Sequence, residues 1–154
     1  RRHARVILQG RAHIAAGGPA PIARPRSHAP HARTLHAPAR VSAQAAEELA
    51  AQGVSCEVIN IRTIRPLDRR TIIESVMKTN RLVTVEEGWP SCGVGAEIGA
   101  CIYESEAFNH LDAPVERVTG ADIPMPYAAN LETEAIPQVK NVVNAVQKVC
   151  YRQG

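Results

Sequence analysis

The sequence has few aromatic residues, no closely spaced cysteines and no long apolar run. Aromatic residues make up 3% of its 154 positions, which leaves few side chains for stacking on nucleic-acid bases. No stretch of about 18 consecutive apolar residues occurs, so a membrane-spanning helix is excluded. The length suits one modest soluble domain, and a multi-domain enzyme with its own complete cofactor site is not expected.

The cysteines do not form a zinc-type or redox-type pair. Cys56, Cys92, Cys101 and Cys150 are separated by 36, 9 and 49 residues, whereas zinc and thioredoxin-like sites begin with two cysteines about three to five positions apart. We interpret the four as reduced thiols of an intracellular protein, most of them buried as small apolar side chains.

Acidic residues are missing from the first part of the chain, and this divides the sequence in two. Residues 1–40 contain eight arginines, five of the six histidines, five of the eleven prolines, and no lysine or acid. Residues 41–154 contain ten basic and all fifteen acidic residues, a net charge of −5. The positive charge therefore lies in a segment without aromatics, not on a folded face, and we expect no nucleic-acid partner.

The basic head, residues 1–40, has little apolar patterning. Residues 5–16 are compatible with a strand. Residues 17–40 repeat Pro, His, Arg and Ala, and such a segment cannot bury enough apolar surface to offset the entropy of ordering it. Three interpretations stay open for it: a targeting peptide, a metal site formed by its histidines, or a disordered or aberrantly translated insertion, which the composition favours.

From Val41 onward, helical and strand patterns alternate along the chain. The patterns predict helices at residues 41–52, 68–78, 93–104 and 137–150, strands at residues 55–61, 81–85 and 114–119, and a proline-rich loop at residues 120–131. Crossovers of this length between strands require a mostly parallel sheet with helices on both faces. We therefore predict an α/β fold, a three-layer αβα sandwich, for residues 41–152.

No self-contained catalytic constellation is evident at the predicted strand ends, where open α/β sheets place their sites. Glu86 and Glu87 alternate to opposite sides, so we interpret them as a cap or an interface ion pair. The Gly-Val-Gly sequence at residues 93–95 lacks the further residues of a phosphate loop and predicts close packing of a helix. His110 is the only histidine after the head, and no nucleophile elbow is present.

Apolar side chains occur instead in two proline-containing loops. Trp89 follows the second predicted strand, and Met125 and Tyr127 follow the third. Such residue types are common in protein interfaces, and neighbouring prolines reduce the entropy lost on docking. We predict that these three residues contact a partner; the alternative is that they fold back on the core.

Three stretches resemble the C-terminal domain of the beta subunit of the thiamine-diphosphate-dependent pyruvate dehydrogenase component. They are CEVINIRTIRPLD at residues 56–68, KTNRLVTVEEG at residues 78–88 and LDAPVERVTGADIPMPYAANLE at residues 111–132. The resemblance extends over about residues 41–152 and implies the fold of transketolase C-terminal domains. The Met-Pro-Tyr-Ala sequence favours the mitochondrial pyruvate enzyme over the branched-chain 2-oxoacid enzyme.

The resemblance implies that the whole enzyme decarboxylates pyruvate oxidatively and passes the acetyl group to a lipoyl group. Thiamine diphosphate and magnesium would bind between the alpha subunit and the N-terminal domain of beta. This sequence does not contain that N-terminal domain. We therefore assign it no catalytic, cofactor-binding or metal-binding residue and expect no cofactor on this chain alone.

The resemblance also implies partners and a compartment. The partners would be the alpha subunit, a second beta subunit and the binding domain of dihydrolipoamide acetyltransferase. By its place in the Leu-Asp-Ala-Pro motif, Asp112 is expected to meet a basic residue of that binding domain. The compartment would be the mitochondrial matrix, with the plastid stroma or bacterial cytoplasm as alternatives.

Three hypotheses about function remain open at this point. The first is a beta-subunit fragment that is inert alone and serves assembly and docking, in which residues 17–40 come from a truncated or mispredicted gene product. The second is a non-catalytic regulator that occupies the same docking site. The third is the beta subunit of a branched-chain 2-oxoacid dehydrogenase.

Overall fold

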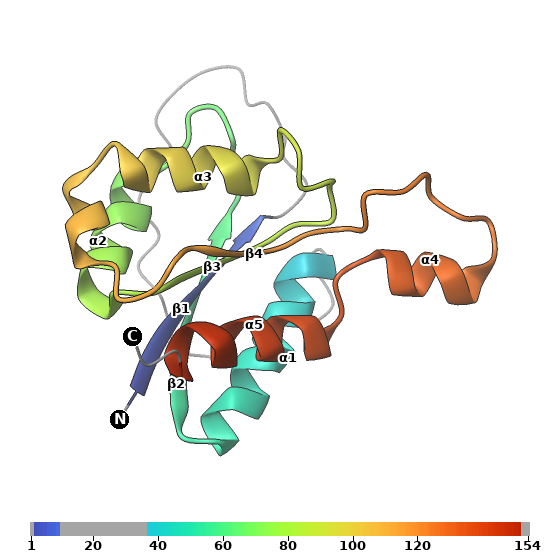
Figure 1. The fold of residues 1–154 in the computed structure, drawn as a ribbon, viewed down its shortest axis with the longest axis horizontal. Coiled ribbons are helices and arrows are strands. Elements are labelled where there is room, and N and C mark those ends of the chain that lie inside the picture. The colour runs from blue at the N-terminus through green and yellow to red at the C-terminus, as the bar shows by residue number, and fades with distance from the viewer. Residues whose placement is uncertain (1, 10–36, 152–154) are drawn as a thin grey trace.

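The computed structural model describes residues 2–9 and 37–151 (Figure 1). In this part of the chain, strands and helices alternate as the sequence predicts. The strands are β1 (Arg2–Gln9), β2 (Val54–Ile61), β3 (Leu82–Val85) and β4 (Glu116–Val118). The helices are α1 (Ala37–Ala51), α2 (Arg69–Thr79), α3 (Val94–Tyr103), the 3-10 helix η1 (Glu106–His110), α4 (Ala129–Ala135) and α5 (Val139–Tyr151). None of the described helices has the length and apolar character needed to cross a membrane.

The strands form one parallel sheet in the order β2-β1-β3-β4. Strand β1 therefore lies inside the sheet, with β2 on one side and β3 on the other. The strand expected from residue 5 onward corresponds to β1. Residues 10–36 lie outside the described residues, so the rest of that prediction and the three interpretations of residues 17–40 are not tested there. The connection between β2 and β3 crosses β1, so the strand order changes direction between β1 and β3.

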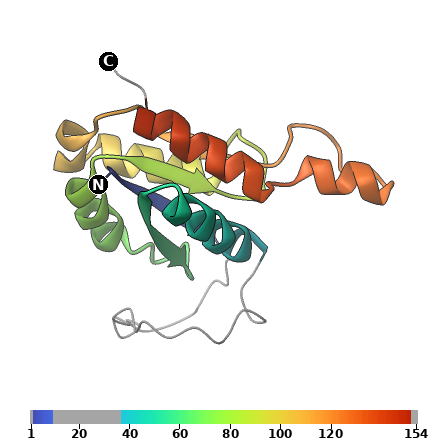
Figure 2. The ribbon, with the colours of Figure 1, turned by 90° about the horizontal axis from the view of Figure 1, so that it is seen from below.

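Helices cover both faces of the sheet, and each face has its own apolar core. Helices α1 and α5 contact each other on one face, and α2 and α3 contact each other on the other (Figure 2). Strand β3 supplies both cores by simple alternation, because Val83 and Val85 join the α1/α5 core while Leu82 joins the α2/α3 core. The predicted three-layer αβα sandwich is confirmed.

Helix α2 shows how local sequence signals define the boundaries of an element. Asp68 Oδ1 accepts the N–H of Thr71 at 3.1 Å, and Asp68 Oδ2 accepts the Thr71 hydroxyl at 2.7 Å. These bonds satisfy an N–H that has no partner in the first turn of a helix. At the other end, Asn80 adopts the left-handed conformation, with φ 62°, and ends the helix. The predicted helix at residues 68–78 is confirmed.

The first helix begins at Ala37 and not at Val41, so the predicted start is wrong. The Ser42 hydroxyl donates to the carbonyl of Pro38 at 3.0 Å, and Ala39 is buried in the α1/α5 core. A proline near the start of a helix costs nothing, because the N–H groups of the first turn have no intrahelical acceptor. Residues 37–40 therefore belong to α1, although their composition continues that of the basic head.

Two predictions near the C-terminus are also corrected. The predicted loop at residues 120–131 runs into helix α4, which the sequence does not indicate because only Ala135 of this helix is buried and no apolar stripe is present. Pro137 precedes α5 and does not lie in its first turn. The start of α5 is fixed instead by Asn141, whose Oδ1 accepts the N–H of Gln138 at 2.9 Å.

Candidate functional site

The carboxyl ends of the parallel strands meet at one edge of the sheet, where α/β domains usually place their sites. At this edge, the turn at residues 86–93 follows β3. The segment at residues 120–135, which we call the arm, follows β4. The N–H of Gly120 donates to the carbonyl of Gly88 at 2.9 Å, which joins the arm to the turn. Figure 1 shows the arm, in orange, extending away from the sheet.

A buried carboxylate caps helix α3 at this edge. Glu86 is only 4% exposed, and its Oε1 accepts the N–H of Gly95 at 3.1 Å. A Cβ atom added to Gly93 would lie 2.7 Å from Glu86 Oε2, and one added to Gly95 would lie 2.5 Å from Glu86 Oε1. The glycines therefore make room for this side chain. The predicted role of Glu86 as a cap is confirmed, and Glu87 is exposed beside it.

The described part of the carboxyl edge does not fit a diphosphate group or its magnesium ion. The positive end of a helix dipole attracts an anion, but at α3 this position is filled by the Glu86 carboxylate. Among the side chains that the structure describes, no three from His, Cys, Asp or Glu are grouped so that they could hold a metal ion. We derive no chemical step through either group.

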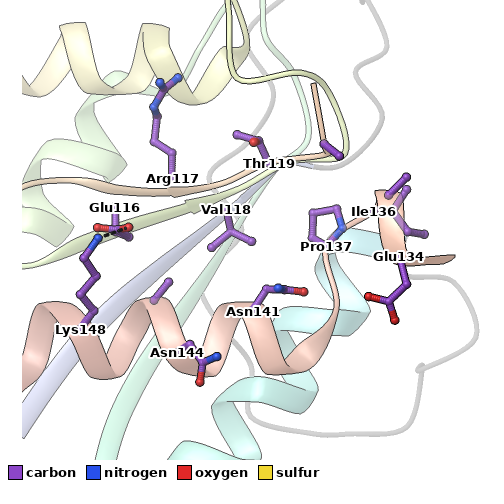
Figure 3. A pocket seen from close by; sticks show the side chains of 13 residues that line it. Glu116, Arg117, Val118, Thr119, Glu134, Ile136, Pro137, Asn141, Asn144 and Lys148 are labelled. Carbon is purple, nitrogen blue, oxygen red and sulfur yellow. Dashed lines mark hydrogen bonds and ion pairs between the residues drawn. The ribbon is translucent and has the colours of Figure 1, made fainter. Parts of the chain in front are cut away.

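A groove of about 440 Å³ lies beside β4, the last strand in the order of the sheet (Figure 3). Helix α5 contributes the opposite wall through Asn141, Asn144 and Lys148. Lys148 Nζ lies 2.7 Å from Glu116 Oε1, so one ion pair spans the groove. The lining also includes Arg117 and Glu134, so two basic and two acidic side chains balance and favour neither an anionic nor a cationic ligand.

The apolar side chains predicted to contact a partner are on the surface. Trp89 is 59% exposed, Met125 54% and Tyr127 105%. The alternative that these residues fold back on the core is wrong, while contact with a partner stays a prediction. Ile123 and Leu131, 49% and 54% exposed, belong to the same arm and are not among the three predicted contact residues.

Asp112 lies at the opposite edge of the sheet from these residues, because it precedes β4 while the arm follows it. Its N–H donates to the carbonyl of Asn80 at 2.8 Å, and its Oδ2 lies 3.5 Å from Arg81 Nη2. The Arg81 Nε donates to the carbonyl of Val149 in α5 at 3.0 Å. The structure therefore does not bring Asp112 together with Trp89, Met125 and Tyr127.

The cysteines differ strongly in their surroundings. All four are free thiols: Cys92 is exposed, Cys56 is half-buried, and Cys101 and Cys150 are buried. Burial, with a smaller contribution from neighbouring Cys150, raises the pKa of Cys56 to about 11. Burial also raises the pKa of Cys101. Both groups are therefore held as neutral thiols near pH 8, and thiols react far more slowly than thiolates.

Cys92 is expected to react with iodoacetamide at pH 8 at least about tenfold faster than Cys56 or Cys101. Cys92 is exposed, whereas the raised pKa of Cys56 leaves on the order of one thiolate per thousand molecules at this pH. Mass spectrometry of the modified peptides over time measures each rate. In urea the difference should disappear. Equal labelling of Cys56 and Cys92 in the folded protein would contradict the burial described for Cys56.

Comparisons with known proteins agree with the fold. Residues 37–142 match the family described as "Transketolase, C-terminal domain". The solved structure of "Split gene transketolase, inactive beta4 tetramer" superposes with a TM-score of 0.65 and 24% sequence identity, covering 96% of this chain and 38% of that chain. At this identity the likeness shows the fold alone.

Curated relatives are much more similar in sequence. The chain is 63% identical over 109 residues to "Pyruvate dehydrogenase E1 component subunit beta-1, mitochondrial" of Oryza sativa subsp. japonica, covering 71% of this chain and 29% of the relative. It is 65% identical over 105 residues to "Pyruvate dehydrogenase E1 component subunit beta, mitochondrial" of Homo sapiens, covering 68% and 29%. The chain spans less than a third of the length of these relatives.

Proposed function

This chain belongs to the transketolase C-terminal domain family, and we propose from this premise that it acts as the C-terminal domain of the beta subunit of a mitochondrial pyruvate dehydrogenase. In this role the domain contributes contacts to a thiamine-diphosphate-dependent enzyme whose catalytic groups lie elsewhere. Its partners are the alpha subunit, a second beta subunit and the binding domain of dihydrolipoamide acetyltransferase. The identities of 60–65% to beta subunits named as mitochondrial support the choice of enzyme and compartment.

One observation supports the proposal that the described residues bind partner subunits and supply no catalytic group. At the carboxyl edge, where α/β domains usually bind their ligands, Glu86 is the one deeply buried carboxylate among the described residues, and it serves as a helix cap. Trp89, in the turn that follows β3, and Met125 and Tyr127, in the arm that follows β4, are exposed. Exposed large apolar side chains are typical of protein interfaces.

Asp112 is the group through which we propose that the domain docks to the acetyltransferase. Its side chain is half exposed, while Arg81 lies beside it and is itself fixed to the Val149 carbonyl. A carboxylate has lone pairs for more than one donor, so Asp112 can accept a basic group of the binding domain while Arg81 holds it in place. Such a contact at the rim of an interface mainly sets orientation and encounter rate.

A calorimetric titration of the full chain with the acetyltransferase binding domain tests this function. We expect saturable binding at micromolar concentration and a loss of about three- to thirtyfold in affinity for Asp112→Ala, because one charge pair is removed. Asp122→Ala, which alters an exposed aspartate at the other edge of the sheet, is the matched control and should bind as wild type. No binding at micromolar concentration, or an equal loss in both variants, would count against the proposal.

A further inference from the structure

Strand β4 has a free side along which the groove runs. On its inner side, Val118 pairs with Val85, and the Val118 carbonyl accepts the N–H of Glu86 at 2.9 Å. The hydrogen-bonding groups of successive strand residues point to alternate sides, so the N–H and C=O of Arg117 point outward. Among the described residues, none bonds to these two groups. Such an edge is a template for a further strand.

The groove beside this edge has an apolar floor. Val118, Ala135 and Ala145 line it and are buried, and Ile136 and Pro137 extend the apolar lining. Figure 3 shows Val118 directed from β4 toward α5, across the space between strand and helix. The three residues of β4 span about 10 Å, so an extended segment of about four residues would lie alongside it. The small floor residues leave room for side chains of that segment.

The charged side chains of the groove already have partners within the chain. Lys148 Nζ lies 2.7 Å from Glu116 Oε1, and Lys140 Nζ lies 3.3 Å from Glu134 Oε2. Arg117 Nη1 donates to a backbone carbonyl of the turn after β3 at 2.8 Å, and its side chain points away from α5 (Figure 3). A charged ligand would have to displace one of these contacts. The ligand that matches the groove is therefore uncharged.

Neutral hydrogen-bonding groups stand on both walls of the groove. Asn144 lines it from α5, and its exposed side-chain amide makes no hydrogen bond with the described residues. An amide side chain both donates and accepts, as do the outward N–H and C=O of Arg117 on the opposite wall. An extended polypeptide carries N–H and C=O groups along both of its edges. It can therefore bond to both walls without carrying charge.

We propose that this groove binds an extended, uncharged polypeptide segment of another protein, which adds to β4 as a further strand of the sheet. Backbone hydrogen bonds supply affinity in this mode of recognition, and pockets for alternate side chains supply selectivity. Small apolar side chains of the segment would lie on the floor formed by Val118, Ala135 and Ala145. The proposal goes beyond the proposed function and does not depend on it.

An NMR titration of the full chain with a six-residue peptide of alternating Ala and Thr, blocked at both ends, tests the proposal. We expect the Arg117 N–H resonance to shift, with half-saturation at about 1 mM, because few hydrogen bonds must offset the entropy lost on binding. The same peptide with every amide N-methylated cannot donate and should bind at least about tenfold more weakly. Affinity should change less than about twofold between 50 and 500 mM salt, because no charge is involved.

Two variants on α5 locate the site. Asn144→Ala should weaken binding of the peptide about two- to tenfold, because one hydrogen-bonding amide is lost. Gln147→Ala is the matched control, since Gln147 is on the same helix outside the groove and bonds to Gln52; it should bind as wild type. Circular dichroism checks that both variants are folded.

Four results would overturn the proposal. They are the absence of any shift at Arg117 up to about 10 mM peptide, equal binding of the N-methylated peptide, binding by Asn144→Ala as tight as that of wild type, and shifts confined to β2, the strand at the other end of the described sheet. Self-association through β4 would also overturn it. In that case the Arg117 resonance would shift with protein concentration before peptide is added, and sedimentation would show a dimer.

Discussion

Gly95→Ala is expected to lower the free energy of unfolding by about 2–4 kcal/mol. The added Cβ would lie 2.5 Å from Glu86 Oε1 and 2.7 Å from Thr84 Oγ1, and both side chains are buried. Relief of this overlap would move the carboxylate away from the Gly95 N–H, so the variant combines overpacking with a lost buried hydrogen bond. Urea unfolding followed by far-ultraviolet circular dichroism measures the change.

Gly99→Ala is the matched control, because Gly99 belongs to the same helix and an added Cβ meets no atom within 4 Å. Alanine is favoured over glycine inside a helix by up to about 1 kcal/mol, so this variant should be as stable as wild type or more stable. A Gly95→Ala variant whose stability equals that of Gly99→Ala would show that Glu86 does not occupy the start of α3.

Leu49→Ala is expected to destabilise the domain by about 3 kcal/mol. Leu49 is 0% exposed and lies in the core between the sheet and helices α1 and α5. Its replacement removes apolar contacts and leaves a cavity, and such changes cost about 2–5 kcal/mol. For a chain of this size the melting temperature should fall by roughly 6–12 °C. Differential scanning calorimetry gives both quantities.

Leu131→Ala provides the same chemical change on the surface. Leu131 is 54% exposed in α4, so its replacement should change stability by no more than about 0.5 kcal/mol. Similar losses for the two leucine variants would contradict the packing of α1 in the core. Since Leu131 belongs to the arm, an effect of this variant on binding without an effect on stability would be consistent with the proposed interface.

The fold could be predicted from the sequence because helical and strand patterns alternate after residue 41 and long crossovers demand parallel strands. The role of β1 could not, because strand order depends on pairing between distant segments. The sequence indicates only an additional strand, whereas β1 lies between β2 and β3. The start of α1 and the whole of α4 do not follow from the sequence. Residues 37–40 share the composition of the basic head, and α4 buries too little to show a pattern.

The sequence indicates single residues of the candidate site, and only the structure shows which of them contact one another. The sequence offers a cap as one of two roles for Glu86 and predicts a close approach at the glycines of residues 93–95, but it does not indicate their contact with each other. The exposure of Trp89 and Met125 does not follow from the sequence, which leaves folding back on the core open; only the structure shows it. The ion pair between Asp112 and Arg81 depends on the turn between α2 and β3, which no local pattern specifies.

The separation of the two surfaces, by contrast, was available from the sequence. Asp112 precedes the last predicted strand, and the arm follows it. In a parallel sheet these positions must lie at opposite edges. The domain therefore has two candidate contact surfaces, one on each side of β4.

The central claim is that this domain supplies contacts and no catalytic group. A pyruvate decarboxylation assay tests it most directly: the full chain is mixed with alpha subunit, thiamine diphosphate, magnesium and pyruvate, and release of carbon dioxide is followed, with a full-length beta subunit as the positive control. The account predicts no release above that of the alpha subunit alone, although the chain binds that subunit. Measurable turnover with this chain in place of the full-length beta subunit would contradict it.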